Sequence, residues 1–355
     1  MATVVTGTGV ARPPNVVTNH HLARIMDTSD EWIRTRSGVV ERRFVDPGVG
    51  ASDLAVIAAR HALDDAGLGP ADVDAIVTAT MTPDLQNPGI ASLVQDKLGC
   101  GPVASFDLRQ QCSGFLYGLD LADALVATSR ADTVLVVGAE VHAGYLPWGE
   151  TWDIVLGRSE RRPTAEEWDR NTEHRAWSVL FGDGAGAMVL RRDERDDVGV
   201  IASVLRTDGS HFELIVVPGL GSLRRPYADE AQLAAGLQLP RMDGGGLYRQ
   251  AVRLMPEAVE EVLDAAGFTP ADLDLVVAHQ ANDRILDGVR RRMNLAAEVV
   301  PSNIARWGNT TSGTLPILYD ELRREGRIRP GALVAFTAFG AGAHWGAVLY
   351  RQPQE

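Results

Sequence analysis

Lysine and cysteine are nearly absent from this chain of 355 residues. Lys97 is the only lysine, so most Schiff-base chemistry is excluded, and the many arginines favour planar recognition of phosphate or carboxylate groups. The two cysteines, Cys100 and Cys112, are too few for a disulfide framework and lack the paired spacing of a zinc site. No cluster of histidine and acidic residues has metal-ligand spacing either. We therefore expect a reducing, cytoplasmic location and no metal site.

The sequence also lacks a long apolar run and an excess of positive charge. It has no stretch of about 18 consecutive apolar residues and no basic start followed by an apolar run, so neither a membrane span nor export is expected. The formal net charge of −13 and the pI near 5.1 argue against a nucleic-acid or anionic-membrane partner, because such partners select basic surfaces. With 45% apolar and 23% charged residues, the composition is that of a globular protein with room for two domain-sized halves.

One pattern occurs twice along the chain. The segment ALDDAGLGPADVDAIVTAT, from Ala62, matches VLDAAGFTPADLDLVVAHQ, from Val262. Each copy predicts an amphipathic helix that ends at a glycine, then a Pro-Ala-Asp turn and a short apolar strand. This order is typical of α/β folds that contain a buried parallel sheet. The repetition indicates an internal duplication.

The two copies also end alike. FGDGAGAMVLRR, from Phe181, and FGAGAHWGAVLYR, from Phe339, each give a glycine-rich turn followed by an apolar strand. Because FGDGAGA precedes a strand rather than a helix, we reject a nicotinamide cofactor. The polar run RRDERDD marks the linker, so we divide the chain into halves at 1–195 and 196–355. Two such halves packed face to face predict an α/β fold with five layers, α-β-α-β-α.

A long excursion interrupts the first half. Residues 142–174 lie between two predicted core strands, are rich in tryptophan and arginine, and form a segment much longer than a usual loop. Such excursions are often functional. From its position, this one is expected to reach the mouth of a site or a subunit interface.

Cys112 is the first candidate for chemistry. In SFDLRQQCSGFLYGLDLADALV, a short strand at 104–108 leads through a turn into a helix, so the cysteine falls at the helix N-terminus. The macrodipole and the free N–H groups there would stabilise a thiolate, which is the form that attacks carbonyl groups. The alternative is that Cys112 is simply a small buried hydrophobic residue, as free cysteine often is.

Two further candidates lie in the second half. His279 ends the duplicated strand where the first copy has Ala79, and the carboxyl end of a parallel strand points to the crevice in which α/β proteins place their sites. Asn309 lies in a Gly-Asn turn before a run of hydroxyl residues that can cap the next helix. A structural histidine and a turn-forming asparagine are the alternatives.

Six motifs, in order along the chain, resemble the β-ketoacyl-acyl-carrier-protein synthase III family. They are TSDEWIRTRSGVVERR at Thr28, QCSGFLYGL at Gln111, VLFGDGAGA at Val179, HQAN at His279, WGNTTSGTLP at Trp307 and FGAGAHWG at Phe339. The resemblance covers essentially the whole chain and implies a thiolase-like five-layered fold, which agrees with the duplication. It also implies a homodimer, the common symmetric assembly.

The resemblance implies a two-step reaction. Cys112 would be acylated from an acyl-CoA, and His279 with Asn309 would hold a malonyl thioester while it loses carbon dioxide. The carbanion would then attack the acyl-Cys112, which is a decarboxylative Claisen condensation, with the enolate stabilised by the two donors. The backbone N–H groups of Cys112 and Ala341 would form the oxyanion hole. Acyl-CoA is thus expected as a substrate, with no permanently bound cofactor.

The resemblance also implies binding residues. Trp32 would stack on the CoA adenine with Arg36 and Arg175 around the nucleotide, because stacking and arginine suit an adenine nucleotide phosphate. Asn282 would lie near the pantetheine arm, and Phe181 would line the acyl tunnel. A basic strip would meet an acidic acyl carrier protein, although a solvated helix face is an equal alternative for each of its arginines. Its members are Arg249, Arg284, Arg291 and Arg292.

Three departures from the family pattern favour a specialised relative that acts in a natural-product or unusual-acyl pathway. The segment 142–174 has no counterpart in the common synthase and is expected to reshape a substrate pocket. RMDGGGLYR at Arg241 places three glycines near the expected pantetheine arm. Finally, Ala341 replaces a glycine of the terminal glycine-rich turn.

Two other functions remain compatible with these residues. An acyltransferase would pass the acyl group from Cys112 to an alcohol or amine, with His279 as general base, and only condensation would release carbon dioxide. A non-catalytic partner that binds carrier protein would usually lack the nucleophile. The joint presence of Cys112, His279 and Asn309 argues against that second alternative.

Overall fold

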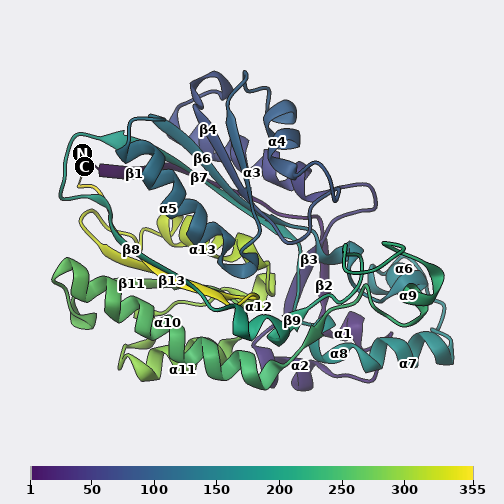
Figure 1. Ribbon diagram of the computed structural model, residues 1–355. Coiled ribbons are helices and arrows are strands. Elements are labelled where there is room, and N and C mark those ends of the chain that lie inside the picture. The colour runs from purple at the N-terminus through teal and green to yellow at the C-terminus, as the bar shows by residue number, and fades with distance from the viewer. Residues whose placement is uncertain (1, 355) are drawn as a thin grey trace.

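The computed structural model describes residues 2–354 and contains two stacked sheets (Figure 1). The first sheet has the strand order β1-β7-β6-β4-β5 and the second has the order β11-β12-β13-β8. The first is formed by β1 (Ala2–Ala11), β4 (Ala75–Ala79), β5 (Ala104–Leu108), β6 (Thr133–Glu140) and β7 (Gly184–Asp193). The second is formed by β8 (Gly199–Thr207), β11 (Leu275–Ala278), β12 (Leu333–Gly340) and β13 (His344–Arg351). The linker expected around residue 195 lies between β7 and β8.

Helices form three layers around the two sheets, which confirms the predicted five-layered α-β-α-β-α fold (Figure 1). The helices α3 (Ala51–Ala66) and α4 (Ile90–Leu98) cover the outer face of the first sheet. The helices α5 (Gly114–Ala127) and α13 (Thr314–Arg324) lie between the sheets. The helices α10 (Gly244–Ala266) and α11 (Asp283–Arg292) cover the outer face of the second.

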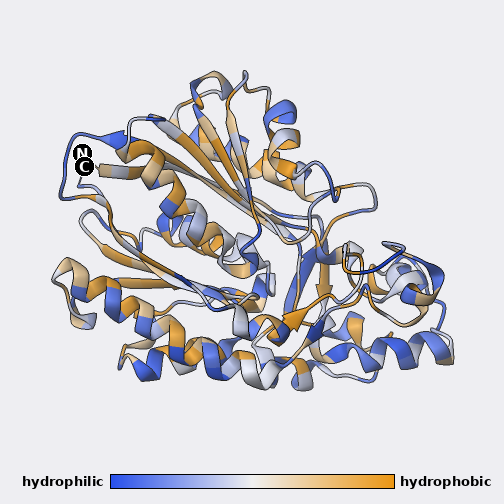
Figure 2. Ribbon diagram, in the orientation of Figure 1, coloured by the Kyte–Doolittle hydropathy of each residue, from blue (hydrophilic) through white to orange (hydrophobic). Residues whose placement is uncertain are grey.

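The central layer is the main hydrophobic core. Apolar side chains from both inner sheet faces meet α5 and α13 there, and all eight residues of β6 and of β12 are buried. Hydrophobic colour runs along the strands in Figure 2, as expected for a sheet covered on both faces. The buried strands therefore hold the ends of α5 and α13 in fixed positions.

The duplicated pattern has the predicted local structure in both copies. The helix α3 ends at Gly67 and the helix α10 ends at Gly267, and both glycines adopt the left-handed conformation, with φ of 67° and 75°. A Pro-Ala-Asp turn follows each helix and leads into β4 or β11.

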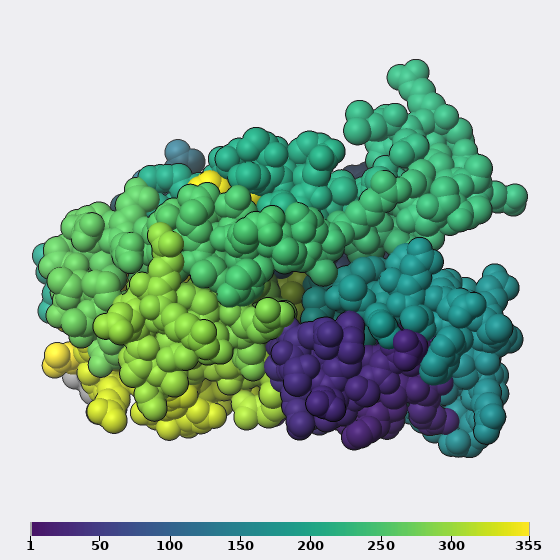
Figure 3. All heavy atoms as spheres, turned by 90° about the horizontal axis from the view of Figure 1, so that it is seen from below, coloured from purple at the N-terminus to yellow at the C-terminus, as the bar shows by residue number. Residues whose placement is uncertain are grey.

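The N-terminal region and the excursion pack against each other beside the layered body. The N-terminal part consists of β2 (Asn15–Thr18), α1 (Asn19–Leu22), α2 (Asp30–Ser37) and β3 (Glu41–Phe44). The excursion and the residues that follow it contain α6 (Trp152–Val155), α7 (Ala165–Glu173) and α8 (Arg175–Ser178). Their apolar side chains form one cluster around Trp148 and Phe44, and Figure 3 shows the two segments, purple and teal, side by side.

A second irregular segment stands out from the body. It joins β9 (Ile215–Val216) to β10 (Arg241–Met242), carries α9 (Glu230–Ala234), and projects at the upper right of Figure 3. Leu223 at its surface is fully exposed. The remaining helix, α12 (Ile304–Trp307), precedes the turn that holds Asn309. Among residues 2–354, no helix combines the length and apolarity needed to cross a bilayer.

Candidate active site

A cavity of about 1000 Å³ collects residues from the ends of strands in both sheets. Cys112, His279, Asn309 and Ala341 all line it, although they come from four separate parts of the fold. Phe181 and Asn282 line the same cavity. The structure thus brings together the three expected catalytic side chains and the two expected neighbours of the acyl and pantetheine chains.

Cys112 lies in the short 3-10 helix η2 (Gln111–Ser113), directly before α5. The preceding residue, Gln111, has a φ of 52°, a conformation that non-glycine residues rarely adopt and that strained functional turns often contain. The cysteine is therefore placed by a tight turn between the end of β5 and the first turn of a buried helix.

The environment of Cys112 corrects the expectation of a stabilised thiolate. Burial raises the pKa of the Cys112 thiol to about 12, and the Glu140 carboxylate acts in the same direction. The residue's own backbone N–H opposes the shift but does not overcome it. The thiol is thus protonated at neutral pH and has to lose its proton as it attacks.

Gly340, at the end of β12, lies against the backbone of the Cys112 turn. A Cβ atom at this position would come within 2.9 Å of the Gln110 carbonyl oxygen and 3.0 Å of the Cys112 nitrogen. Because backbone atoms cannot move aside cheaply, only glycine allows β12 to approach the nucleophile this closely.

Substituting alanine for Gly340 is expected to lower the free energy of unfolding by about 1–3 kcal/mol, because the added methyl group meets backbone on the Cys112 turn. Chemical denaturation measures this change. Gly101→Ala is the matched control, because nothing lies within 4 Å of a Cβ there. Equal stability of the two variants would contradict the close approach.

His279 follows β11, and one edge of its ring is held by Thr314. The Nδ1 atom lies 2.7 Å from the Thr314 hydroxyl, which also donates to the Thr311 carbonyl oxygen at 2.9 Å. The Nε2 atom has no partner among the described residues, so it is the ring nitrogen available to a ligand in the cavity. Burial lowers the pKa of His279 to about 3, so the imidazole is neutral at physiological pH.

We expect the ring of His279 to stay neutral between pH 5 and 8, because burial disfavours the imidazolium. The imidazole ¹⁵N resonances, assigned by their loss in His279→Gln, should then keep the shifts of a neutral ring throughout this range. A transition near pH 6.5, the ordinary histidine value, would contradict the placement of the ring.

Asn309 is fixed by its backbone and by one side of its amide. Its N–H donates to the Leu180 carbonyl oxygen at 2.8 Å, and its Oδ1 atom accepts from the Thr311 N–H at 2.8 Å. The Nδ2 group has no partner among residues 2–354. It is therefore a pre-oriented neutral donor in the same cavity as the His279 ring.

Two backbone donors accompany these side chains. Cys112 and Ala341 both line the cavity, and within the described chain neither backbone N–H has a hydrogen-bond acceptor in another residue. The first N–H groups of a helix have no partner inside it, which explains the free donor at Cys112. The two residues expected to form the oxyanion hole therefore line the same cavity.

The expected nucleotide-binding residues lie together on the surface beside the cavity. The guanidinium carbon of Arg36 lies 4.5 Å from the centre of the Trp32 ring and that of Arg175 lies 4.9 Å from it. Arg175 also pairs with Asp27 at 2.8 Å. Asn282 connects this surface to the cavity, because its amide donates to the Arg36 carbonyl oxygen at 2.9 Å and also caps α11.

The four arginines of the expected carrier-protein surface are exposed on α10 and α11. Arg291 and Arg292 are partly neutralised by Asp287 and Glu257. The other two, Arg249 and Arg284, have no acidic partner among the described residues.

Sequence reasoning missed the buried Glu140 at the end of β6. Its carboxylate accepts hydrogen bonds from the backbone of Met81 and Thr82 and from the Ser312 hydroxyl at 2.7 Å. It therefore ties the loop after β4 to the turn that follows Asn309. The sequence Gly-Ala-Glu at the end of an apolar strand could have pointed to a buried Glu140. Only the fold, however, shows which donors surround its carboxylate.

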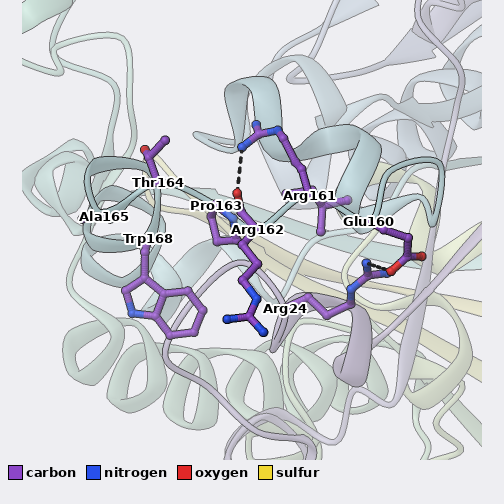
Figure 4. Close-up of a pocket in the computed structure, with 9 residues that line it drawn as sticks. Arg24, Glu160, Arg161, Arg162, Pro163, Thr164, Ala165 and Trp168 are labelled. Carbon is purple, nitrogen blue, oxygen red and sulfur yellow. Dashed lines mark hydrogen bonds and ion pairs between the residues drawn. The ribbon is translucent and has the colours of Figure 1, made fainter.

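The excursion contributes to the cavity through its first residues. His142, Tyr145 and Leu146 line the cavity. Its later residues form a separate hollow, in which the side chains of Arg162 and Trp168 extend to the same side (Figure 4). Arg24 and Arg161, which also line this hollow, pair with Glu160 and Glu167. The first residues of the excursion thus form part of the wall of the cavity.

Sequence models of one family match both parts of the chain. The model described as 3-oxoacyl-[acyl-carrier-protein (ACP)] synthase III matches residues 106–157 and 164–209, and the corresponding C-terminal model matches residues 263–352. The first match is interrupted at 158–163, inside the excursion.

Curated proteins and solved structures resemble the chain over almost its full length. The β-ketoacyl-[acyl-carrier-protein] synthase III of Symbiobacterium thermophilum is 42% identical, covering 98% of this chain and 97% of the relative. The crystal structure of 3-oxoacyl-[acyl-carrier-protein] synthase III from Aquifex aeolicus is 38% identical, covers 99% of this chain and 100% of its own, and superposes with a TM-score of 0.84. The priming β-ketosynthase of the R1128 polyketide pathway is 30% identical, with coverages of 99% and 97% and a TM-score of 0.84.

Proposed function

Because this chain belongs to the 3-oxoacyl-[acyl-carrier-protein] synthase III family, we propose that Cys112, His279 and Asn309 carry out its acyl transfer and decarboxylative condensation. The chain is a condensing acyltransferase. The observation that supports this assignment of roles is that the three side chains, from separate elements, line one cavity beside two unpaired backbone N–H groups.

In the first step, the Cys112 sulfur attacks the carbonyl carbon of an acyl-CoA. The negative charge on the carbonyl oxygen is held by the N–H groups of Cys112 and Ala341. The Nε2 lone pair of His279 acts as the base that relays the thiol proton to the departing CoA sulfur within the same step, so that CoA leaves as a thiol and the disfavoured imidazolium does not accumulate. This base is needed because the buried thiol of Cys112 is protonated at neutral pH.

In the second step, the malonyl thioester oxygen lies between the Nε2 atom of His279 and the Nδ2 group of Asn309. Loss of carbon dioxide places the electron pair on the enolate, which these two donors stabilise. The enolate carbon attacks the acyl-Cys112 carbonyl, the 3-oxoacyl thioester forms, and the Cys112 sulfur leaves as a thiolate that takes up a proton from solvent. His279 has to accept at Nε2 in one step and donate in the other.

Thr314 suits this change of role. Its hydroxyl can accept from Nδ1–H while it donates to the Thr311 carbonyl oxygen, or it can turn and donate to Nδ1. Either neutral tautomer of His279 therefore keeps a partner, and the proton position at Nε2 can follow the reaction.

CoA would enter past Trp32, Arg36 and Arg175, whose mutual contacts support an adenine and phosphate site. An acyl carrier protein would meet the exposed arginines of α10 and α11, of which Arg249 and Arg284 are without acidic partners in the described chain. Opposite charge on a partner of this kind would steer its approach.

We also propose a homodimer that forms through β5. This strand lies at the edge of the first sheet, has one strand neighbour among the described residues, and has partly exposed side chains. Unpaired edges of this kind readily pair with a second chain. The two free cysteines in the described chain support a reducing, cytoplasmic setting.

A specialised acyl donor is supported by the lining of the cavity, because residues of the excursion form part of its wall. The similarity to the R1128 priming ketosynthase is compatible with such a role.

Release of labelled carbon dioxide tests the condensing function directly. Malonyl-carrier protein labelled at the free carboxyl group is incubated with the enzyme and a panel of acyl-CoAs. Condensation predicts that label is released only when both substrates are present, together with the 3-oxoacyl product. Acyl transfer to an alcohol or amine without release of label would instead establish the acyltransferase alternative.

A further inference from the structure

Arg109, directly after β5, supplies the one full charge in the wall of the catalytic cavity. Among the described residues that line this cavity, none is an aspartate, a glutamate or a lysine, and Arg109 is the only arginine. Burial lowers the pKa of the three histidines that line it, His142, His279 and His344, so these rings are neutral at physiological pH. Most of the other lining side chains are apolar. The cavity therefore favours a negative group at one place on its wall.

The guanidinium group of Arg109 is unpaired within the described chain. The backbone carbonyl oxygen of Arg109 accepts from the Gln111 side-chain amide at 2.9 Å, but the guanidinium has no ion pair or hydrogen bond with any of residues 2–354. The buried carboxylate of Glu140 does not line the cavity and already accepts from the backbone of Met81 and Thr82. The charge of Arg109, whose side chain is exposed, is thus available to a ligand.

Arg109 lies close both to the nucleophile and to a second donor. Arg109 and Cys112 are three residues apart, so even a fully extended backbone keeps their Cα atoms within about 11 Å. Burial raises the pKa of the Tyr145 phenol and the Arg109 cation acts in the opposite direction, which places these two side chains within electrostatic reach of each other. Tyr145 also lines the cavity, and its hydroxyl has no hydrogen-bond partner in the described chain.

A carboxylate suits this pair of donors. The planar fork of arginine matches the two oxygens of a carboxylate, and a phenol O–H can donate to the same group. The phosphates of CoA would pair with the same chemistry, but their expected site is the separate surface cluster of Trp32, Arg36 and Arg175. The ligand group at Arg109 is therefore expected to be a carboxylate inside the cavity.

Two substrates could bring a carboxylate into this cavity, the malonyl thioester and the acyl donor. Pairing the malonyl carboxylate with Arg109 would stabilise the charged group that has to leave as neutral carbon dioxide. Such a contact is stronger in the ground state than in the transition state, so it would slow decarboxylation. A carboxylate on the donor acyl chain keeps its charge throughout the reaction, and pairing it has no such cost.

We propose that Arg109 and Tyr145 bind a carboxylate at the end of the donor acyl chain, so that acyl-CoAs of dicarboxylic acids are preferred over those of monocarboxylic acids. This inference rests on the proposed acylation of Cys112. The chemistry of that step is unchanged: the bond from the Cys112 sulfur to the carbonyl carbon forms, the bond from this carbon to the CoA sulfur breaks, and the thiol proton leaves with CoA.

The test compares acyl-CoAs of equal chain length that differ by a terminal carboxylate. The pairs are glutaryl-CoA with pentanoyl-CoA, adipoyl-CoA with hexanoyl-CoA, and suberoyl-CoA with octanoyl-CoA. Acylation of Cys112 is followed without malonyl thioester by quenched-flow intact-protein mass spectrometry, which gives a second-order rate constant for each donor. We expect the dicarboxylic member of at least one pair to react about 10- to 100-fold faster. Because Arg109 is exposed, this ratio should fall as salt is raised from about 0.05 to about 0.5 M.

Three variants assign the preference. Arg109→Gln should bring the ratio close to one by slowing only the dicarboxylic donor, and Tyr145→Phe should reduce the ratio by about threefold. Arg130→Gln is the matched control, because Arg130 is also exposed, has no acidic partner in the described chain and does not line the cavity. It should leave the ratio unchanged. Equal slowing of both donors in Arg109→Gln would show that the arginine supports the Cys112 turn and would overturn the assignment.

The wild-type comparison decides the inference even where a variant does not fold. Equal rate constants within every pair, with normal adducts on Cys112, would overturn the carboxylate preference and leave the proposed function intact. If Arg109→Gln leaves every acylation rate unchanged but slows the consumption of malonyl-carrier protein, the arginine serves the malonyl carboxylate and the inference is wrong. Absence of any adduct from any donor would overturn the proposed function itself.

Discussion

Cys112→Ala is expected to abolish CoA release from acyl-CoA and, with it, formation of the 3-oxoacyl product, with a loss of at least about 10³-fold. The thiol is the only nucleophile that the account places beside the two unpaired N–H groups. Its removal leaves no atom to hold the acyl group between the two steps. A free-thiol assay for CoA, in the presence and absence of malonyl-carrier protein, measures the loss.

Cys100 provides the matched control for this substitution. It is also buried, burial also raises its pKa, and it does not line the cavity. Cys100→Ala should therefore keep CoA release within about threefold, as expected for a substitution away from the site. Comparable losses in both variants would show that the effect is structural, and unchanged activity of Cys112→Ala would contradict the role of Cys112.

Asn309→Asp is expected to separate the two steps. The substitution keeps the Oδ1 atom that accepts from the Thr311 N–H, but it replaces the free Nδ2 donor with a carboxylate oxygen. The enolate then loses a donor and meets an anion, so condensation should fall by about 10²- to 10³-fold. Formation of the acyl adduct on Cys112 should change by less than about tenfold, because Asn309 takes no part in that step. Rapid-quench mass spectrometry resolves the two rates.

Asn309→Ser, a neutral and smaller side chain, checks whether the introduced charge causes the effect. A loss of condensation in both variants supports the missing donor, whereas a loss confined to Asn309→Asp points to charge repulsion alone. If both steps slow equally in both variants, Asn309 supports the turn rather than the enolate.

The layered fold could be predicted because the duplication is marked by short sequence features that determine local structure. A glycine that ends a helix and a Pro-Ala-Asp turn before an apolar strand recur at Gly67 and Gly267, and each signal acts within a few residues. The pairing of β5 at the sheet edge could not be read in the same way, because strand order depends on contacts between residues far apart in sequence.

Only part of the active site could be predicted, because its other features depend on contacts between residues that are far apart in the sequence. His279 and Asn309 could be named as candidates because each lies in a recognisable strand end or turn, and both line the cavity. The thiol of Cys112 illustrates what local reasoning omits, since its position before a helix predicts a lowered pKa but burial and Glu140 raise it. Gly340 and His142 depend entirely on distant partners, the Gln110 carbonyl and the Gly182 carbonyl, which the sequence does not bring together.

Intact-protein mass spectrometry through one turnover tests the central claim most directly. The enzyme is mixed first with an acyl-CoA and then with malonyl-carrier protein, and the masses of both proteins are followed. The account predicts an acyl adduct on Cys112 that disappears as the carrier protein becomes the 3-oxoacyl form, with loss of carbon dioxide. An adduct that persists with malonyl-carrier protein and clears only when an alcohol or amine is added would contradict it.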